Sequence, residues 1–338
     1  MLRRTVIALH RFAALYAGLL IVALGLTGSI VVFESDIDRW LNPRLLSVQP
    51  EETQIPLAML LRIVQKAYPD DRIVEINIPW QDNISHQVNL AGGVQVYLNG
   101  HTGEILGSRV AGTSMAYKLH HYHTDLLQGE VGRVITGIGS IFLLFITVTG
   151  LFLWWQRRIV SVTWRASWAR IRFDSHHLLG VCASIVFLVL TYTGILIAFS
   201  EPVPPLPAPE GTVLDEEATP ITLDAAVAVA DAALPDARAT VIGIPAGPSS
   251  PIRISKKFPD EVSPSGRSRV YVDQFSGKVL AVEDARVASL STRVSRLTRP
   301  IHTGAIYGWP TRALAFFAGI VIVLQTVTGF SMWWRRGG

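Results

Sequence analysis

Four long apolar segments are the feature that most limits what this chain can fold into. They cover about residues 12–33, 131–155, 178–199 and 313–334. A helix needs about 20 predominantly apolar residues to cross the hydrocarbon core of a bilayer, and each segment reaches that length. Of the whole chain, 49% of the residues are hydrophobic and only 17% are charged, which does not suit a soluble protein. The sequence therefore predicts four transmembrane helices.

Arginine residues mark one side of these helices. They flank the first span, fill the short connection after the second, and end the chain: Arg3, Arg4, Arg11, Arg157, Arg158, Arg165, Arg170, Arg172, Arg335 and Arg336. Arginine beside a span is retained in the cytoplasm, so we expect both termini and residues 156–176 there. The two long connections then lie on the other side, the periplasm of a bacterium. The arginines suit anionic lipid headgroups rather than nucleic acid.

The first apolar segment follows two arginines, as in a signal peptide, but it is too long and no A-x-A cleavage pattern follows it. We therefore expect an uncleaved helix in a bacterial inner-membrane protein. The predicted order is a first span in 1–33, a periplasmic domain in 34–130, a span in 131–155, a cytoplasmic basic loop in 156–176, a span in 177–200, a second periplasmic domain in 201–310, and a last span with a cytoplasmic tail in 311–338. Cys182 is the only cysteine, so no internal disulfide and no cysteine-ligated metal site can form.

Fixed offsets indicate an internal duplication. Residues 10–28 (HRFAALYAGLLIVALGLTG) align with residues 176–194 (HHLLGVCASIVFLVLTYTG) at an offset of 166. The offset later grows to 179, where the matched pairs are His123-Thr124 with His302-Thr303, Thr149-Gly150 with Thr328-Gly329, and Trp154-Trp155 with Trp333-Trp334. A unit with two spans returns to its starting side. We therefore expect the two copies to be related by a parallel pseudo-two-fold axis along the membrane normal.

Each long connection is predicted to form a small α+β module. An amphipathic helix, about 56–68 or 222–234, precedes three or four short strands. The strands are expected at about 73–79, 86–91 and 94–99 in the first module, and at 239–244, 251–257 and 269–273 in the second. The proline-rich stretch 202–220 is expected to be an extended lead-in. His86 and His101 have no histidine counterpart in the other copy and are predicted to be solvated.

Four histidines occupy equivalent positions in the two copies. His10 and His176 open the first and third spans at the cytoplasmic face, and His123 and His302 precede the second and fourth spans at the periplasmic face. Under a parallel axis, the members of each pair lie at equal depth. Two axial imidazoles leave no open position on a haem iron, so such a site passes electrons rather than binding oxygen. The pattern predicts two bis-histidine haem sites, one near each membrane face.

The same residues have simpler interpretations. A histidine at a membrane surface is often only a polar cap, and paired tryptophans at the end of a span are typical of an aromatic belt. The Thr-Gly steps at Gly28, Gly150, Gly194 and Gly329 favour either close helix packing or room for a flat porphyrin.

Three further histidines compete as ligands: His120, His121 and His177. The repeat pairs the first of them with Arg299 and the last with Arg11, so symmetry favours His123 and His176. On a helix, His121 does not share a face with His123.

The motifs are H-R-x-x-A and H-H-x-x-G opening the first and third spans, H-T followed by T-G-x-x-x-W-W in the second and fourth, and Y-x-x-x-x-x-G in both modules. Together they resemble the PepSY-associated transmembrane protein family over nearly the whole chain. That family includes bacterial inner-membrane ferric-siderophore reductases and iron-regulated membrane proteins. The resemblance implies a membrane α+β fold of four transmembrane helices and two periplasmic PepSY-like domains, with haem b as cofactor.

By position, the resemblance implies that His10 and His176 hold one haem b and that His123 and His302 hold a second. Ala14 departs from the glycine usual in the family four residues after the first histidine, whereas Gly180 keeps it. By their proximity in sequence, three arginines are candidate partners of the haem propionates: Arg11, Arg172 and Arg299.

We therefore expect a haem-containing reductase that carries electrons to the periplasm and reduces an Fe(III)-siderophore or similar ferric chelate. Reduction to Fe(II) weakens binding by hard oxygen ligands. No G-x-G-x-x-G nucleotide-binding fingerprint occurs in a strand–helix context, so a quinol or a separate cytoplasmic reductase would supply electrons. Two alternatives stay open: a non-catalytic PepSY module that binds periplasmic proteins, and a haem electron carrier for a periplasmic redox enzyme.

Overall fold

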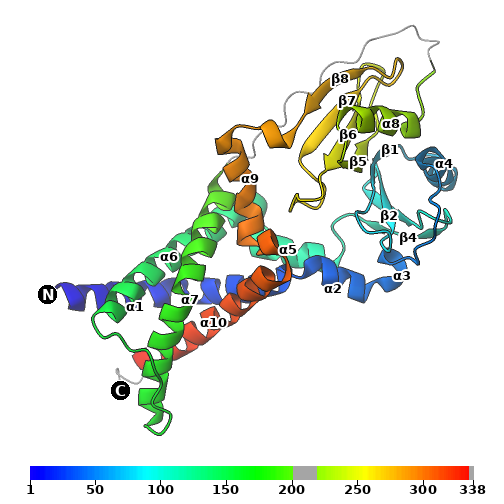
Figure 1. The fold of residues 1–338 in the computed structure, drawn as a ribbon. Coiled ribbons are helices and arrows are strands. Elements are labelled where there is room, and N and C mark those ends of the chain that lie inside the picture. The colour runs from blue at the N-terminus through cyan, green and yellow to red at the C-terminus, as the bar shows by residue number, and fades with distance from the viewer. Residues whose placement is uncertain (201–218, 335–338) are drawn as a thin grey trace. The chain divides into compact units, whose positions relative to one another are not determined.

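The computed structural model describes residues 1–200 and 219–334. The chain divides into a helical unit, Met1–Ser35, Met115–Pro202 and Val294–Gly338, and a sheet unit, Asp36–Ser114 and Val203–Arg293 (Figure 1). Arg335, Arg336 and nearly all of the predicted lead-in at 202–220 lie outside the described residues.

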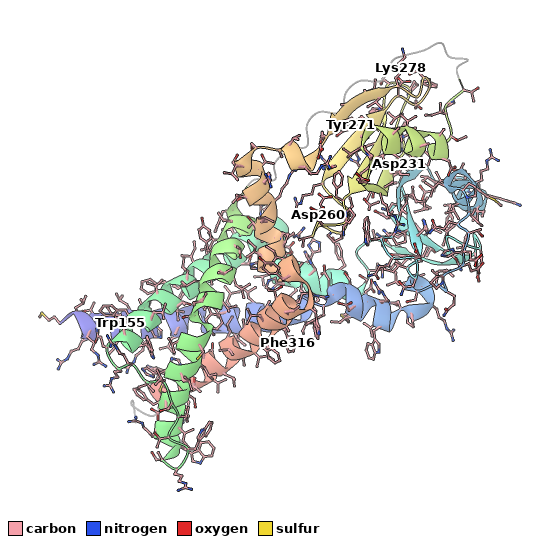
Figure 2. All side chains as sticks on the ribbon, viewed as in Figure 1. Trp155, Asp231, Asp260, Tyr271, Lys278 and Phe316 are labelled. Atoms are coloured by element: carbon pink, nitrogen blue, oxygen red, sulfur yellow. The ribbon has the colours of Figure 1, made fainter. Side chains whose placement is uncertain are left out.

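Four long helices form the helical unit: α1 (Leu2–Val31), α6 (Gly129–Trp155), α7 (Trp168–Phe199) and α10 (Trp309–Trp334). All four are long and apolar enough to cross a membrane, which confirms a long apolar helix at each of the four predicted positions. α1 and α7 begin about ten residues before their apolar segments, because the polar residues that flank each span continue the same helix. Trp155, at the end of α6, is 64% exposed (Figure 2), as expected for an aromatic belt.

Small residues allow the long helices to approach closely. α1 and α7 each pack against both α6 and α10. Where α1 crosses α10, a Cβ added at Gly319 would lie 2.3 Å from Gly25 O, and Ser29 Oγ donates to Phe316 O at 2.9 Å. Close backbone contact of this kind replaces the hydrophobic effect as the source of helix association in lipid.

Two shorter helices precede the second and fourth spans. They are α5 (Met115–Asp125) and α9 (Leu290–His302), the latter followed by the 3₁₀ turn η2 (Ala305–Tyr307). The helix α5 carries His120, His121 and His123. α9 continues through Pro300 and ends at His302.

The sheet unit contains one antiparallel sheet of eight strands in the order β4-β3-β2-β1-β5-β6-β7-β8. The strands are β1 (Ile73–Asn77), β2 (His86–Leu90), β3 (Val94–Leu98), β4 (Ile105–Val110), β5 (Arg238–Gly243), β6 (Ile252–Lys257), β7 (Ser268–Val272) and β8 (Val279–Glu283). The six predicted strands are confirmed to within about two residues. The sequence did not predict that both modules share one sheet, which β1 and β5 join by pairing Ile76 with Ile242.

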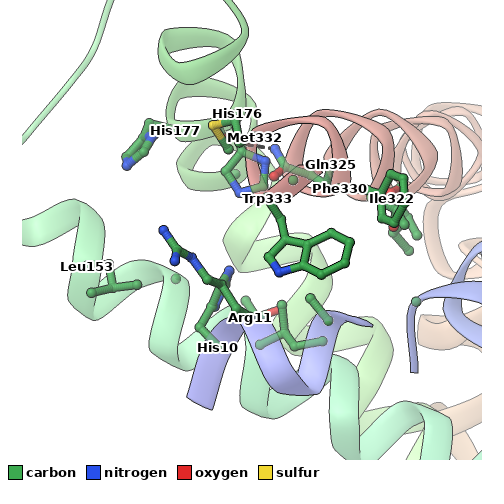
Figure 3. A pocket seen from close by; sticks show the side chains of 18 of the residues that line it. His10, Arg11, Leu153, His176, His177, Ile322, Gln325, Phe330, Met332 and Trp333 are labelled. Carbon is green, nitrogen blue, oxygen red and sulfur yellow. Dashed lines mark hydrogen bonds between the residues drawn. The ribbon is translucent and has the colours of Figure 1, made fainter. Parts of the chain in front are cut away.

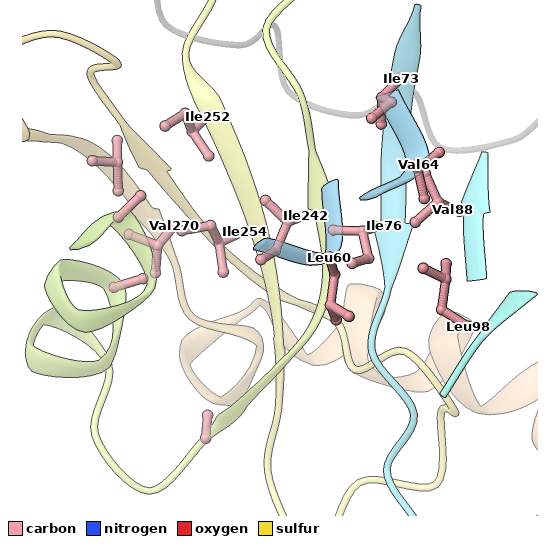
Figure 4. Packing of buried hydrophobic residues seen from close by; sticks show 14 of the residues in the cluster. Leu60, Val64, Ile73, Ile76, Val88, Leu98, Ile242, Ile252, Ile254 and Val270 are labelled. Atoms are coloured by element: carbon pink, nitrogen blue, oxygen red, sulfur yellow. The ribbon is translucent and has the colours of Figure 1, made fainter. Parts of the chain in front are cut away.

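One helix from each module packs against the apolar face of this sheet. α4 (Leu57–Ala67) and α8 (Leu223–Ala233) contribute Leu60, Val64, Ala226 and Ala230 to the core. Leu60 lies near Ile76 and Ile242, and Val64 lies near Val88, within one cluster (Figure 4). Asp224 of α8 also caps α4, because its carboxylate accepts from Leu57 N and Ala58 N at 2.9 and 3.0 Å. The remaining elements of the sheet unit are α2 (Glu34–Leu41), which begins in the helical unit, α3 (Pro43–Leu46) and η1 (Ala285–Val287).

The prediction that His86 and His101 are solvated was wrong. They are only 3% and 8% exposed. His86 occupies the same face of β2 as Val88 and Leu90, so the two-residue alternation of the strand already indicated burial. His101 lies 2.9 Å from Thr53 O and 3.3 Å from Asp82 O through its two ring nitrogens.

Burial, with His101 nearby, lowers the pKa of His86 to about 4. The unfolded chain, with an ordinary histidine pKa of about 6.5, therefore binds the proton first as the pH falls. We expect the free energy of unfolding of the sheet unit to drop by about 3 kcal/mol between pH 6.5 and pH 4. Hydrogen-exchange protection of β2 and β3 in the full chain, corrected for the intrinsic rate at each pH, measures this. The variant His86→Gln should lose most of the pH dependence, and an equally steep profile would contradict the assignment.

Candidate functional site

The first histidine pair lies inside a pocket of the helical unit. His10 of α1 and His176 of α7, which we call the α1/α7 pair, both line a cavity of about 760 Å³ (Figure 3). Pockets for small molecules and cofactors measure roughly 300–1,000 Å³. Residues from all four long helices line it, among them Gly150 and Gly329.

The second pair comes from the two short helices. His123 of α5 and His302 of α9, the α5/α9 pair, have ring centres 6.3 Å apart and ring planes inclined by 39°. A metal bound end-on between two imidazoles needs about 4 Å between the nitrogens, because each bond is about 2 Å long as measured for zinc. Each ring centre lies about one ring radius behind its nitrogen, so the distance between the two ring centres is longer than the nitrogen–nitrogen distance by two ring radii. The observed 6.3 Å between the ring centres therefore suits a shared metal.

The protonation of the α5/α9 pair also suits ligation. Burial lowers the pKa of both His123 and His302 to about 4. Both imidazoles are therefore neutral at pH 7, and the neutral ring is the form that binds a metal.

A threonine from another helix holds each of the four rings. His10 Nδ1 lies 2.9 Å from Thr149 Oγ1, and His176 Nδ1 lies 3.0 Å from Thr328 Oγ1. In the α5/α9 pair the corresponding distances are 3.1 Å to Thr27 Oγ1 and 3.0 Å to Thr193 Oγ1. All four histidines of the two pairs therefore contact a threonine hydroxyl through Nδ1.

The glycine after each threonine makes room for the ring. A Cβ added at Gly28 would lie 2.8 Å from His123 Cε1, and the matching distances at the other three glycines, Gly150, Gly194 and Gly329, are 3.3, 3.2 and 3.3 Å to the Cε1 atoms of His10, His302 and His176. The sequence interpretation of these glycines was helix packing or porphyrin clearance. Each has an imidazole as a close neighbour, and Gly194 also lies at a helix contact, where its added Cβ would be 3.2 Å from Ser140 Oγ of α6. We call each Thr-Gly step with its histidine a histidine seat.

Each half of the chain builds two seats by itself. In the first half, the ring of His10 contacts a threonine of α6 and the ring of His123 contacts a threonine of α1. In the second half, His176 contacts a threonine of α10 and His302 contacts a threonine of α7. α1 carries both His10 and Thr27, 17 positions later. At a rise of 1.5 Å per residue this is about 26 Å along the helix, which approaches the thickness of a hydrocarbon core, about 30 Å.

The competing histidines have other partners. His120 Nδ1 lies 2.7 Å from a Glu34 carboxylate oxygen, and its Nε2 lies 3.4 Å from an Arg299 nitrogen. His121 Nδ1 lies 2.7 Å from the Asp125 carboxylate. His177 lines the cavity, but its Nδ1 donates to Phe173 O of its own helix at 2.8 Å. In the hydrogen bonds seen here, these three rings do not use a Thr-Gly step.

The arginines singled out from the sequence occupy different places. Arg11 lines the cavity. Arg3 and Arg157 line it as well, although the sequence did not single them out as candidate partners of the haem propionates. Arg172 donates to Ser331 Oγ of α10. Arg299 lies beside His120, one helical turn before His302.

The sequence analysis also missed Gln325. This side chain of α10 lines the cavity, and its Nε2 donates to His176 O at 2.9 Å. Its repeat counterpart at the offset of 179 is Ile146. The sequence signal that could have identified Gln325 is that it is a polar side chain within an apolar span, where polar residues are often functional.

The donor set suits a metal that brings ligands of its own. Within residues 1–200 and 219–334 there is no group of three or more histidine, cysteine or acidic residues that could hold a metal ion. Haem supplies four ring nitrogens and takes two axial imidazoles, and the ring spacing of the α5/α9 pair fits that group.

The family model described as the PepSY-associated TM region matches residues 7–336. This match confirms the resemblance seen in the motifs. A search of curated proteins gave no match.

The seat at Gly28 can be tested directly. We expect Gly28→Ala to displace the His123 ring, because the new methyl would lie 2.8 Å from Cε1. Solid-state NMR of histidine-labelled protein in bilayers should show shifted His123 ring signals and unchanged His10 signals. Gly18→Ala is the control, since its Cβ would meet only a Thr326 methyl at 3.4 Å. Identical His123 signals in Gly28→Ala and wild type would refute the seat.

Proposed function

The chain belongs to the PepSY-associated transmembrane family, and we propose that it is a haem-containing reductase that carries electrons across the bacterial inner membrane to a ferric chelate. The observation that carries this proposal is the α5/α9 pair, with its 6.3 Å ring spacing and a threonine behind each ring. A hydrogen-bond acceptor behind an imidazole ligand fixes the orientation of its ring.

The α1/α7 pair would hold one haem b and the α5/α9 pair a second. Bound between two imidazoles, haem supplies one-electron transfer with no position open for oxygen. Around the first site, Arg3, Arg11 and Arg157 line the cavity, where they can pair with propionates.

The contacts between equivalent positions support the proposed parallel duplication. His123 and His302 are repeat equivalents, and their rings are neighbours. His120 and Arg299 are also equivalents, and they too are in contact, at 3.4 Å. Residues close to a two-fold axis meet their own counterparts in this way. We propose that the arginine-rich ends face the cytoplasm and that the PepSY-like modules are periplasmic.

The positions of the seats support a path along the span. α1 and α7 each carry one histidine of the α1/α7 pair and one threonine that holds a ring of the α5/α9 pair. These two residues lie about 26 Å apart along each helix, near opposite ends of the span. Electrons from a quinol or a cytoplasmic reductase would enter at the α1/α7 pair and leave at the α5/α9 pair. Oxidation of one quinol releases two electrons and two protons, and the two electrons reduce two Fe(III) ions. Fe(II) binds hard oxygen ligands more weakly, so iron leaves its chelator.

Haem content distinguishes the ligands from their neighbours. We expect the purified chain to bind two haems b, and His302→Gln or His123→Gln to bind one. His120→Gln is the matched control and should keep two, because His120 contacts Glu34 and Arg299 instead of a Thr-Gly seat. The measurement is a reduced-minus-oxidised spectrum with haem quantified per chain. Full haem content in both ligand variants would exclude this pair as ligands.

The same comparison applies to the first pair. His176→Gln should lose one haem while His177→Gln retains both, since His177 Nδ1 is bonded to its own helix. Loss of the same amount of haem in both variants would count against the selection of His176.

Ferric reduction tests the activity and separates the alternatives. In proteoliposomes with a reductant inside, wild type should produce Fe(II) from an external ferric hydroxamate, trapped by a ferrous-specific chelator. His302→Gln should lose most of that rate, because it breaks the second site, whereas His120→Gln should not. A non-catalytic module would give equal background rates for all three. Haem reduction without Fe(II) formation would favour an electron carrier for another periplasmic enzyme.

A further inference from the structure

We infer that four threonines, Thr27, Thr149, Thr193 and Thr328, select the ring nitrogen with which the four histidines bind, by holding the proton on Nδ1 and leaving Nε2 bare. The use of that nitrogen for haem rests on the proposed function. The position of the proton does not, because it follows from hydrogen bonds within the chain.

Each of these hydroxyls has only one hydrogen, and its own helix takes it. Thr27 Oγ1 donates to Ala23 O and Thr149 Oγ1 to Phe145 O, both at 2.7 Å. Thr193 and Thr328 do the same to Val189 O and Leu324 O, at 2.7 and 2.6 Å. All four are bonds to the carbonyl four residues earlier, a common arrangement for threonine within a membrane helix.

A hydroxyl whose hydrogen is committed can only accept from a further partner. The nitrogen 2.9–3.1 Å away in each seat is Nδ1. Nδ1 must therefore carry the hydrogen that this contact needs. A neutral imidazole has one such hydrogen, so Nε2 presents a lone pair.

A backbone carbonyl gives the same answer independently. His302 Nδ1 lies 3.0 Å from Leu190 O as well as from Thr193 Oγ1, and a carbonyl can never donate. Leu190 is three residues before Thr193.

The acceptors in the seats, the threonine hydroxyls and Leu190 O at His302, are uncharged oxygens, unlike the carboxylates that meet His120 and His121. An uncharged acceptor orients the ring without drawing the Nδ1 proton away, so the ligand stays a neutral imidazole. Outer-shell acceptors also raise the basicity of the ligating nitrogen. Without the threonine oxygen, Nε2 should donate less strongly to ferric iron, and the midpoint potential should rise.

The chain supplies a close control for Thr193. Thr191 lies two residues earlier on α7. Its hydroxyl donates to Phe187 O at 2.6 Å and contacts Leu188 O at 3.2 Å, both within its own helix. Thr193→Val and Thr191→Val therefore remove the same group from the same helix, and only the first removes an imidazole partner. Thr193→Ser keeps the hydroxyl.

The first arm of the test uses the full chain in bilayers without haem, with ¹⁵N-labelled histidine rings. We expect the wild-type His302 signals to show a protonated Nδ1 and an unprotonated Nε2. Thr193→Val should shift the Nδ1 signal, because Leu190 O is then its remaining acceptor, while Thr191→Val and Thr193→Ser match wild type. A wild-type His302 protonated on Nε2 would overturn the inference.

The second arm uses the haem-loaded chain. Thr193→Val should raise the midpoint potential of one haem, Thr193→Ser should restore it, and Thr191→Val should leave it unchanged. Unchanged nitrogen signals and potential in Thr193→Val would show that the threonine is not a positioning residue. If the chain binds no haem, the proposed function fails, and the first arm still decides the inference by itself.

Discussion

The contact between a histidine Nδ1 and a threonine hydroxyl from another helix is the interaction on which the helical unit depends. It occurs four times, at 2.9–3.1 Å, and it joins α1 to α6, α5 to α1, α7 to α10 and α9 to α7. An imidazole N–H without a partner is costly in an apolar surrounding. Each contact therefore fixes both the position of a ring and the packing of the two helices that form the seat.

This constraint explains why the two halves are each complete and yet need one another. Each half seats its own two histidines. Only the pairing of the halves brings His123 beside His302 and places His10 and His176 in one cavity. The proposed electron path is thus a property of the paired halves, whereas each ligand's orientation belongs to one half.

Much of this could be predicted from residues with a regular spacing. The apolar segments gave the spans, and alternation in the modules gave strands such as β2 and β3. The pairing of β1 with β5 had no local signal, because strand edges that meet across a repeat leave no pattern in either strand. The repeat identified the four histidines and marked the Thr-Gly steps, but a sequence offset does not show which side chain lies over a glycine. His86 was misjudged because the lack of a repeat counterpart was given more weight than its place in the strand alternation.

Electron paramagnetic resonance of the oxidised, full-length chain tests the central claim most directly. Two axial imidazoles at each site predict two low-spin ferric haem signals per chain, with both sites six-coordinate. A high-spin signal from a five-coordinate haem, or a chain purified under haem-replete conditions with no haem signal at all, would contradict the account.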